Sequence, residues 1–185
     1  MTTTNATHVK VRQANAAHAS AIAHVYVQSW RATYRDILPE QTLTELSEPQ
    51  ETLAWWRTLC RVEPHKSTFV AQGPDAKVVG FASAGPQRPG AHRRRAELYT
   101  LYLLDSHHRQ GLGSRLVSAC AETLLDQGAE SMVVWVLAKN PARQFYEALG
   151  GVPYGARTIR FGGRPVRKIA YLWPELGSLA AVAGS

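Results

Sequence analysis

The chain has few of the features that mark membrane, secreted or metal-dependent proteins. It contains no apolar run near the length of about 18 residues that a membrane span needs. Its opening MTTTNATHVK has no apolar segment of the kind found in secretory signals. Cysteines are scarce, since Cys60 and Cys120 are the only two, and both lie in apolar helical patterns. We therefore expect a cytoplasmic protein with reduced core cysteines.

Metal ligands and two familiar phosphate-binding signatures are also missing. The adjacent histidines His107 and His108 have no Cys or carboxylate partner at a suitable spacing, so we expect no metal. Gly111 and Gly113 are not followed by a lysine, which argues against a nucleoside triphosphatase. Leu116 stands where the third glycine of G-x-G-x-x-G belongs, which argues against a dinucleotide-binding fold.

Charge is present in excess, with a net value of +7 over 185 residues. Nucleic acid or an anionic ligand would each suit this surplus. Lysine and arginine are dispersed except in the run Arg93–Arg95, and no helix-turn-helix or base-stacking motif is present. Nucleic acid is therefore disfavoured as a partner, and a highly charged small cofactor remains. With 45% hydrophobic residues, the chain has enough apolar material for one domain with a sizeable core.

The most informative stretch runs from Leu98 to Leu125. Its first part, Tyr99–Leu104, is dense in aliphatic and aromatic residues and predicts a buried strand. A polar turn with two glycines follows, and then apolar residues recur from Leu116 onward at the spacing of one helix face. A strand that enters a helix through such a turn can hold an anion. The first helical turn has free N–H groups, and glycines let a phosphate approach the backbone.

The rest of the chain alternates between strand and helix patterns. We expect strands at 8–14, 68–71, 78–84, 96–104, 132–137, 152–161 and 166–173, and helices at 16–30, 40–46, 49–60, 114–125 and 140–149. This order predicts a mixed α/β single domain over residues 8–174. The first seven residues are expected to be disordered, 85–95 to form a loop, and 175–185 to form a flexible tail.

Two segments resemble signatures of the GCN5-related N-acetyltransferase (GNAT) family. The family's pyrophosphate loop is Q/R-x-x-G-x-G/A, and His108–Gly113 matches it except that His108 replaces Gln or Arg. The second signature is N-x-x-A-x-x-F-Y-x-x-x-G-F. Asn140–Gly151 matches its Asn, its Phe-Tyr pair and its first Gly; the Ala falls one place early and Gly151 replaces the last Phe. The resemblance extends from about Val9 to Trp173.

The resemblance implies both a fold and a reaction. The fold is a GNAT domain, α+β, with a central, mostly antiparallel mixed sheet of about seven strands. Its two central strands splay apart, and about four to five helices flank it. The reaction moves an acetyl group from acetyl-CoA directly to a primary amine. We expect a small-molecule acceptor, while a protein N-terminus or lysine, and a non-catalytic acyl-CoA sensor, stay open. Dimers are common in the family, so a homodimer is one state to test.

The resemblance also implies roles for individual residues. Tyr146 would protonate the leaving thiolate; alternatively, its ring is simply part of the core. Glu97 could take the amine proton directly or through water; alternatively, Glu97 is a strand-end residue paired with Arg95. Trp30 and Tyr34, four residues apart, are the acceptor-side candidates, although aromatic residues also pack cores. The expected cofactor contacts are Leu101, Tyr102, Leu103, His108, Arg109, Gln110, Gly111, Leu112, Gly113, Ser114, Asn140 and Tyr146.

The basic run His92–Arg95 does not belong with the glycine turn. An extended chain from Arg95 to Leu104 places the run roughly 30 Å from that turn. The run is therefore either a solvated loop or a positive rim on the acceptor side. A rim of this kind would attract amines that carry a carboxylate or a phosphate.

Overall fold

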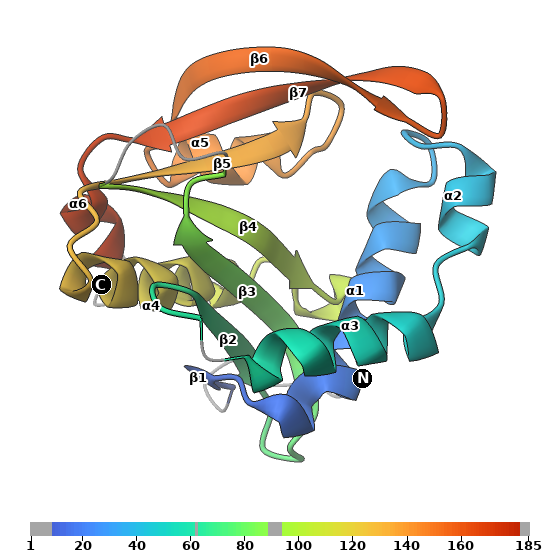
Figure 1. The fold of residues 1–185 in the computed structure, drawn as a ribbon, viewed down its shortest axis with the longest axis horizontal. Helices are drawn as coiled ribbons and strands as arrows, with labels where there is room; N and C mark the ends of the chain where they lie inside the picture. Colours follow the sequence, from blue (N-terminus) through green and yellow to red (C-terminus); the bar gives the residue numbers. More distant parts are fainter. Residues whose placement is uncertain (1–8, 62, 89–93, 182–185) are drawn as a thin grey trace.

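Seven strands form one sheet in the computed structural model, which describes residues 9–61, 63–88 and 94–181 (Figure 1). The strands are β1 (Lys10–Gln13), β2 (Ser67–Gln72), β3 (Val78–Pro86), β4 (Arg95–Leu103), β5 (Ser131–Leu137), β6 (Val152–Phe161) and β7 (Arg164–Trp173). Their order is β1-β2-β3-β4-β5-β7-β6, and only the pair β4–β5 is parallel. The predicted mixed, mostly antiparallel sheet is confirmed.

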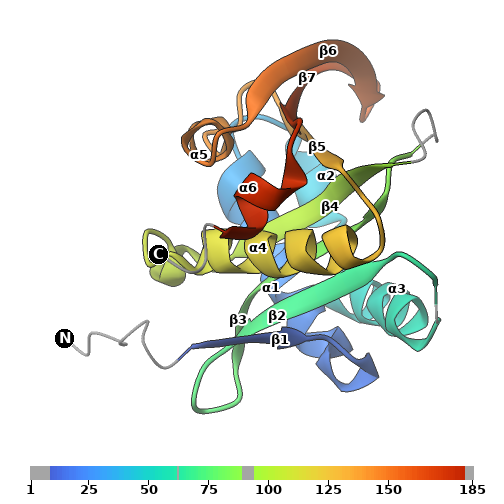
Figure 2. The same cartoon turned by 90° about the vertical axis from the view of Figure 1, so that its left-hand side faces the viewer.

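The two faces of the sheet carry different helices. The helices are α1 (Ala19–Tyr34), α2 (Glu40–Thr44), α3 (Glu48–Cys60), α4 (Leu112–Asp126), α5 (Arg143–Ala148) and α6 (Leu176–Ala180). Side chains of α4, α5 and α6 share one core cluster, whereas α1, α2 and α3 pack on the opposite face in two smaller clusters. Figure 2 shows strands β1–β3 and strands β6–β7 diverging on either side of α4. No helix in the described part of the chain is both long enough and apolar enough to cross a bilayer.

The divergence begins in the middle of β4. This strand pairs with β5 only from Arg95 to Leu98, although both strands continue beyond that point. Against β3, Leu98 pairs with Ala84 and Thr100 pairs with Ser83, so Tyr99 has no direct partner. A bulge of this kind bends and twists a strand. The predicted splayed central pair is therefore present, and the gap opens where the bulge lies.

The helix after the glycine turn follows its predicted periodicity. The buried apolar residues of α4 recur at three-and-four spacing: Leu112, Leu116, Val117, Cys120, Ala121 and Leu124. They pack against the inner residues of β4 and β5, among them Leu98 and Val134. This packing fixes the first turn of α4 at the open end of the gap.

Several predicted boundaries need correction. The first helix is preceded by a 3-10 turn, whose cap is Asn15, and α1 extends to Tyr34 rather than to Trp30. The predicted loop 85–95 is shorter, because β3 continues to Pro86 and β4 begins at Arg95; its residues 89–93 lie outside the described chain. The helix expected from Asn140 begins at Arg143.

The predicted flexible tail is the largest correction. Residues 176–180 form α6, with Leu176 and Leu179 buried in the same core cluster as α4. The Ser118 hydroxyl donates to the Ala180 carbonyl, and the Leu176 N–H donates to the Glu130 carbonyl over 2.8 Å. Burial of two leucines stabilises this short helix. Residues 1–7, expected to be disordered, and the last residues of the tail lie outside the described chain.

Candidate active site

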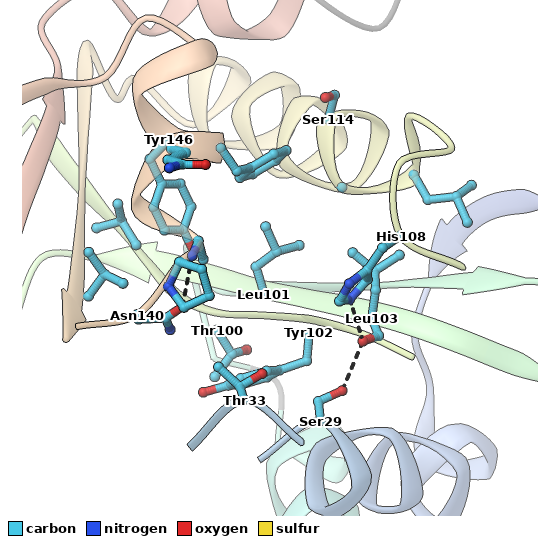
Figure 3. A pocket seen from close by; sticks show the side chains of 18 of the residues that line it. Ser29, Thr33, Thr100, Leu101, Tyr102, Leu103, His108, Ser114, Asn140 and Tyr146 are labelled. Carbon is cyan, nitrogen blue, oxygen red and sulfur yellow. Dashed lines mark hydrogen bonds between the residues drawn. The ribbon is translucent and has the colours of Figure 1, made fainter. Parts of the chain in front are cut away.

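A cavity of about 800 Å³ fills the gap between β4 and β5 (Figure 3). Its walls come from the free edge of β4, the turn before α4, the segment leading into α5, and α1 on the opposite face. The cavity therefore joins both sides of the sheet. Most of the predicted site residues line it: Tyr34, Leu101, Tyr102, Leu103, His108, Arg109, Gly111, Leu112, Gly113, Ser114, Asn140 and Tyr146.

The turn before α4 offers backbone donors to the cavity. Gly111 caps the helix in the left-handed region at φ 74°, and an added Cβ there would meet nothing within 4 Å. Arg109 also has a positive φ, of 58°, which is uncommon for a side chain of its size. Among the described residues, the backbone N–H groups of 109–114 donate no hydrogen bond. These groups and the helix dipole suit an oxyanion.

Gly113, the second glycine of the turn, lacks a side chain for a different structural reason from Gly111. A Cβ on Gly113 would lie 3.1 Å from the ring of Phe145 on α5. The absence of a side chain at Gly113 therefore lets α5 approach α4. The expectation that both glycines serve ligand approach fits Gly111 better than Gly113.

His108 ties the turn to the end of β4. Its Nε2 lies 3.0 Å from the carbonyl oxygen of Leu103, and the Ser29 hydroxyl donates to the same oxygen over 3.0 Å. Figure 3 shows these two contacts converging on Leu103 from opposite sides. The histidine that departs from the family pattern therefore supports the turn through a strand carbonyl.

The free edge of β4 presents unpaired main-chain groups to the cavity. From Thr100 to Tyr102 the strand pairs with β3 on one side only, since pairing with β5 ends at Leu98. The Thr100 hydroxyl oxygen is buried there without a hydrogen-bond partner among the described residues. Unpaired buried polar groups carry a free-energy cost, so this edge is suited to pairing with an extended polar ligand.

Tyr146 directs its hydroxyl toward this edge. The residue is only 5% exposed, and Figure 3 shows its ring reaching from α5 toward Asn140 and β4. Burial, and to a lesser degree the nearby Tyr34, raise the pKa of Tyr146 above the usual value near 10. Within the described chain its hydroxyl has no hydrogen-bond partner. The group is thus a protonated donor that faces the cavity.

Asn140 connects the two sides of the cavity. Its Oδ1 accepts from the Ala142 N–H over 2.8 Å, which caps the turn leading into α5. Its Nδ2 donates to the hydroxyl of Tyr34 on α1 over 3.2 Å. Burial raises the pKa of Tyr34, so this hydroxyl too stays neutral. One side chain therefore positions both α5 and Tyr34 on α1.

Three predicted residues lie away from the described lining. Trp30 packs against Tyr34 and Phe161 in a core cluster, as its alternative interpretation proposed. Gln110 donates to the Ser106 carbonyl over 3.0 Å. Glu97 is buried and accepts hydrogen bonds from the backbone N–H and the guanidinium of Arg88, at 2.9 and 3.2 Å.

The described residues of the basic run, Arg94 and Arg95, bind partners outside the cavity. Arg94 forms an ion pair with Glu130, and Arg95 donates to the Tyr154 hydroxyl over 2.8 Å. The pairing of Glu97 with Arg95, considered from the sequence, is therefore replaced by the pairing with Arg88. His92 and Arg93 lie outside the described residues. In the part of the chain that the structure describes, no three His, Cys, Asp or Glu side chains gather in a metal-binding arrangement.

The sequence missed Ser29, Thr33 and Trp135 as lining residues. The first two lie on the cavity face of α1 and belong to no motif. Trp135 lies in an apolar run that predicted a strand buried on both faces, but the splay leaves its ring half-buried at the gap. No local signal identifies these residues, because their position depends on the separation of two strands.

The comparisons with known proteins agree with this geometry. Residues 29–151 match the model of the acetyltransferase (GNAT) family. The chain is 36% identical over 171 residues to the uncharacterized N-acetyltransferase YuaI of Bacillus subtilis, covering 92% of this chain and 96% of that protein. It is 29% identical over 160 residues to the phosphinothricin N-acetyltransferase of Streptomyces viridochromogenes, covering 84% of this chain and 79% of that one.

Solved structures share the fold. An acetyltransferase, yncA, from Salmonella typhimurium, solved with its cofactor acetyl-CoA, superposes with a TM-score of 0.68 at 21% identity, covering 91% of this chain and 94% of that one. A family match over most of the chain, a curated relative above 30% identity and the splayed sheet lead to one conclusion. The chain belongs to the acetyltransferase (GNAT) family.

Proposed function

We propose that this N-acetyltransferase moves the acetyl group of acetyl-CoA directly to the primary amine of a small molecule. The observation that carries the proposal is the continuity of the cavity. The oxyanion-binding turn, the unpaired edge of β4 and the Tyr146 hydroxyl line one space that extends to α1 on the other face. Donor and acceptor can therefore meet within the gap without a covalent enzyme intermediate.

The cofactor side fits the parts of acetyl-CoA. The free N–H groups around Gly111 would hold the pyrophosphate, where the backbone is open to close approach. The free edge of β4 from Thr100 to Leu103 would bind the pantetheine arm as if it were an added strand. A main-chain N–H near Leu101 would polarise the thioester carbonyl. Acetyl-CoA itself supplies an activated acetyl group.

The bond changes need one acid and one base. A C–N bond forms as the C–S bond breaks; the amine loses a proton and the sulfur gains one. Tyr146 is proposed as the acid, because its hydroxyl is protonated near neutral pH and faces the cavity. Glu97 is proposed as the base, acting through water, since it does not line the described cavity.

The need for a base depends on the acceptor. A lysine-type amine with a pKa of about 10.4 is only about a thousandth neutral near pH 7, whereas an α-amino group with a pKa of about 8 is about a tenth neutral. Removal of the proton therefore limits side-chain-type amines more strongly. We propose Glu97→Gln as the variant that tests this role, through the acid limb of the pH–rate profile.

The acceptor side supports a small substrate. Tyr34 and Leu43 pack against Phe161 and Val166 of the β6–β7 hairpin, so the hairpin covers this part of the gap. A relative is named for the N-acetylation of phosphinothricin, which is a small molecule. A protein N-terminus or lysine would need the hairpin to move aside.

Two free cysteines, one of them exposed, suit a cytoplasmic location.

The test combines binding with turnover. Calorimetry should detect acetyl-CoA binding by the wild type, and thiol release with an amine library should detect transfer. Tyr146→Phe should lower kcat about 100-fold or more with little change in acetyl-CoA affinity. Tyr154→Phe, which removes a hydroxyl outside the cavity, is the matched control and should retain kcat.

The possible outcomes separate the alternatives. Acetyl-CoA binding without turnover on any amine would indicate an acyl-CoA sensor. Turnover on peptides but not on small amines would indicate a protein acetyltransferase. An unchanged kcat in Tyr146→Phe would remove Tyr146 from the mechanism.

A further inference from the structure

Two cations stand side by side on the α1 face of the sheet, next to the gap. Arg157 on β6 and Lys168 on β7 are direct partners in the antiparallel ladder, so their side chains leave the sheet on the same face. Lys168 is also the direct partner of Leu137 on β5. Leu137 packs with Tyr34 on the α1 side. This basic pair, Arg157 and Lys168, therefore lies on the α1 face of the sheet, beside the described lining of the cavity.

The pair is coupled to the cavity through an aromatic wall. The Arg157 guanidinium carbon lies 4.1 Å from the centre of the Trp135 ring, and Trp135 lines the cavity. Across the gap, the Arg88 guanidinium carbon lies 3.9 Å from the centre of the Tyr99 ring, which also lines the cavity. Cationic groups thus stack on lining aromatic residues from both of the separating strands.

The carboxylate of Glu97, which lies in this group, is already occupied. Both oxygens of Glu97 accept hydrogen bonds from Arg88. Within residues 9–61, 63–88 and 94–181, neither Arg157 nor Lys168 has a salt bridge. Burial and then the charge of Arg157 lower the pKa of Lys168, while Glu97 opposes them. An oxyanion placed between the two cations would offset their repulsion.

We infer that the acceptor amine carries an acidic group, a carboxylate or a related oxyanion, that is bound by Lys168 and Arg157. The inference rests on the proposed function and names the substrate class of the same site. The acidic group takes no part in the bond changes; its binding directs the amine toward Tyr146 and the free edge of β4. Polyamines, which carry positive charge at both ends, would be repelled.

The distance along β5 limits the size of the acceptor. The gap opens after Val134, and Leu137, which neighbours Lys168, is three residues further along the strand, or roughly 10 Å. The side chains of Lys168 and Arg157 extend over part of this distance, so the acidic group and the amine of the acceptor can belong to one small molecule. Amino acids of different chain length are therefore compared in the test.

The test is a set of matched amines that differ in one charge. Glycine, β-alanine, 4-aminobutanoate and L-alanine are each compared with their amides, as kcat/KM per neutral amine. We expect at least one acid to be preferred over its amide by about 10-fold or more, which corresponds to about 1.4 kcal/mol. Equal or better use of all the amides would overturn the inference while leaving acetyl transfer intact.

Variants locate the charge recognition. Lys168→Gln should raise KM for the preferred acid about 10- to 100-fold and leave KM for its amide and the acetyl-CoA affinity unchanged. Lys168→Arg should restore much of the loss. Arg167→Gln is the matched control, since Arg167 is the neighbouring residue on β7, is exposed and points to the opposite face. Parallel losses for acid and amide in Lys168→Gln would contradict the inference.

A binding measurement separates this inference from the proposed reaction. The same acids and amides are titrated into the wild type saturated with coenzyme A, with calorimetric detection. Selective binding of an acid that Lys168→Gln abolishes would support the inference even if no acetyl group is transferred. Binding without charge preference would overturn it even in an active enzyme.

Discussion

The two sides of the cavity differ in whether main-chain or side-chain groups line them. On the α4 side, one continuous stretch from β4 through the turn to the first residues of α4 presents mainly main-chain groups. On the α1 side, the wall consists of side chains from α1 and β5, with Tyr34 and Trp135 among them, and the β6–β7 hairpin packs behind Tyr34. The first side offers the same donors whatever its side chains are, and the second depends on each residue.

This difference explains where the chain can vary. A main-chain site requires a particular backbone path, so glycine at Gly111 matters more than the identity of its neighbours. His108 departs from the family pattern and yet lies within an ordinary turn, because it bonds to a strand carbonyl. A side-chain site has no such tolerance, since a lost hydroxyl or charge has no backbone substitute. The predictions below test this contrast.

The largest effect is expected at Gly111. Gly111→Val should weaken acetyl-CoA binding about 100-fold or more, because the new side chain would fill the open space where an oxyanion approaches. The matched control is Gly128→Val at the other end of α4. Both glycines have a positive φ, 74° and 86°, and both have open space around an added Cβ.

The two variants should therefore share the cost of backbone strain, about 1–2 kcal/mol in the free energy of unfolding. Calorimetry and urea unfolding measure the two quantities separately. If Gly128→Val lost acetyl-CoA affinity to the same extent, the loss would reflect a distorted helix, and the turn would not be the binding site.

A smaller effect is expected at Asn140, where the two sides meet. Asn140→Ala removes the acceptor for the Ala142 N–H and the donor to Tyr34. We expect kcat to fall about 10-fold and the free energy of unfolding to fall by about 1–3 kcal/mol, the usual cost of a lost cap or an unpaired buried group. Steady-state kinetics and urea unfolding measure both.

Asn140→Asp is the control for this prediction, because it keeps the oxygen that caps the turn. It should recover most of the stability but not the kinetic loss. Full activity in Asn140→Ala would mean that the link between α5 and Tyr34 does not contribute to the reaction.

The smallest effect is expected at His108. His108→Gln introduces the residue usual in the family and should change acetyl-CoA affinity by no more than about threefold, since the main chain supplies the donors. Titration calorimetry gives the answer. A change of tenfold or more would show that the side chain itself contacts the ligand, and the two sides of the cavity would then differ less in their dependence on side chains.

The sequence predicts the α4 side far better than the α1 side. The strand, the glycine turn and the amphipathic helix are adjacent along the chain, so hydrophobic periodicity and turn residues identify all three. The bulge at Tyr99 leaves no such trace, yet it determines where β4 leaves β5. Ser29, Thr33 and Trp135 become lining residues only because of that separation.

The sequence gives the least information on which charged side chains pair with one another. Arg95 precedes Glu97 by two residues and shares its face of the strand, but Arg88 occupies both oxygens of Glu97. Leu176 and Leu179 of α6 were likewise expected to lie in a flexible tail, because a helix of five residues is too short to show a clear helical period. In both cases the partner comes from a part of the chain that short-range patterns do not reach.

The tip of the β6–β7 hairpin rests on α2. A Cβ added to Gly162 would lie 3.3 Å from both Pro39 and Thr42, which shows how closely the two segments approach. The hairpin is joined to the rest of the sheet through β7 alone and contributes nothing to the turn before α4. It is therefore a separable module: in the reaction proposed above, lengthening or trimming it would change which acceptors enter, while the turn before α4 stays as it is.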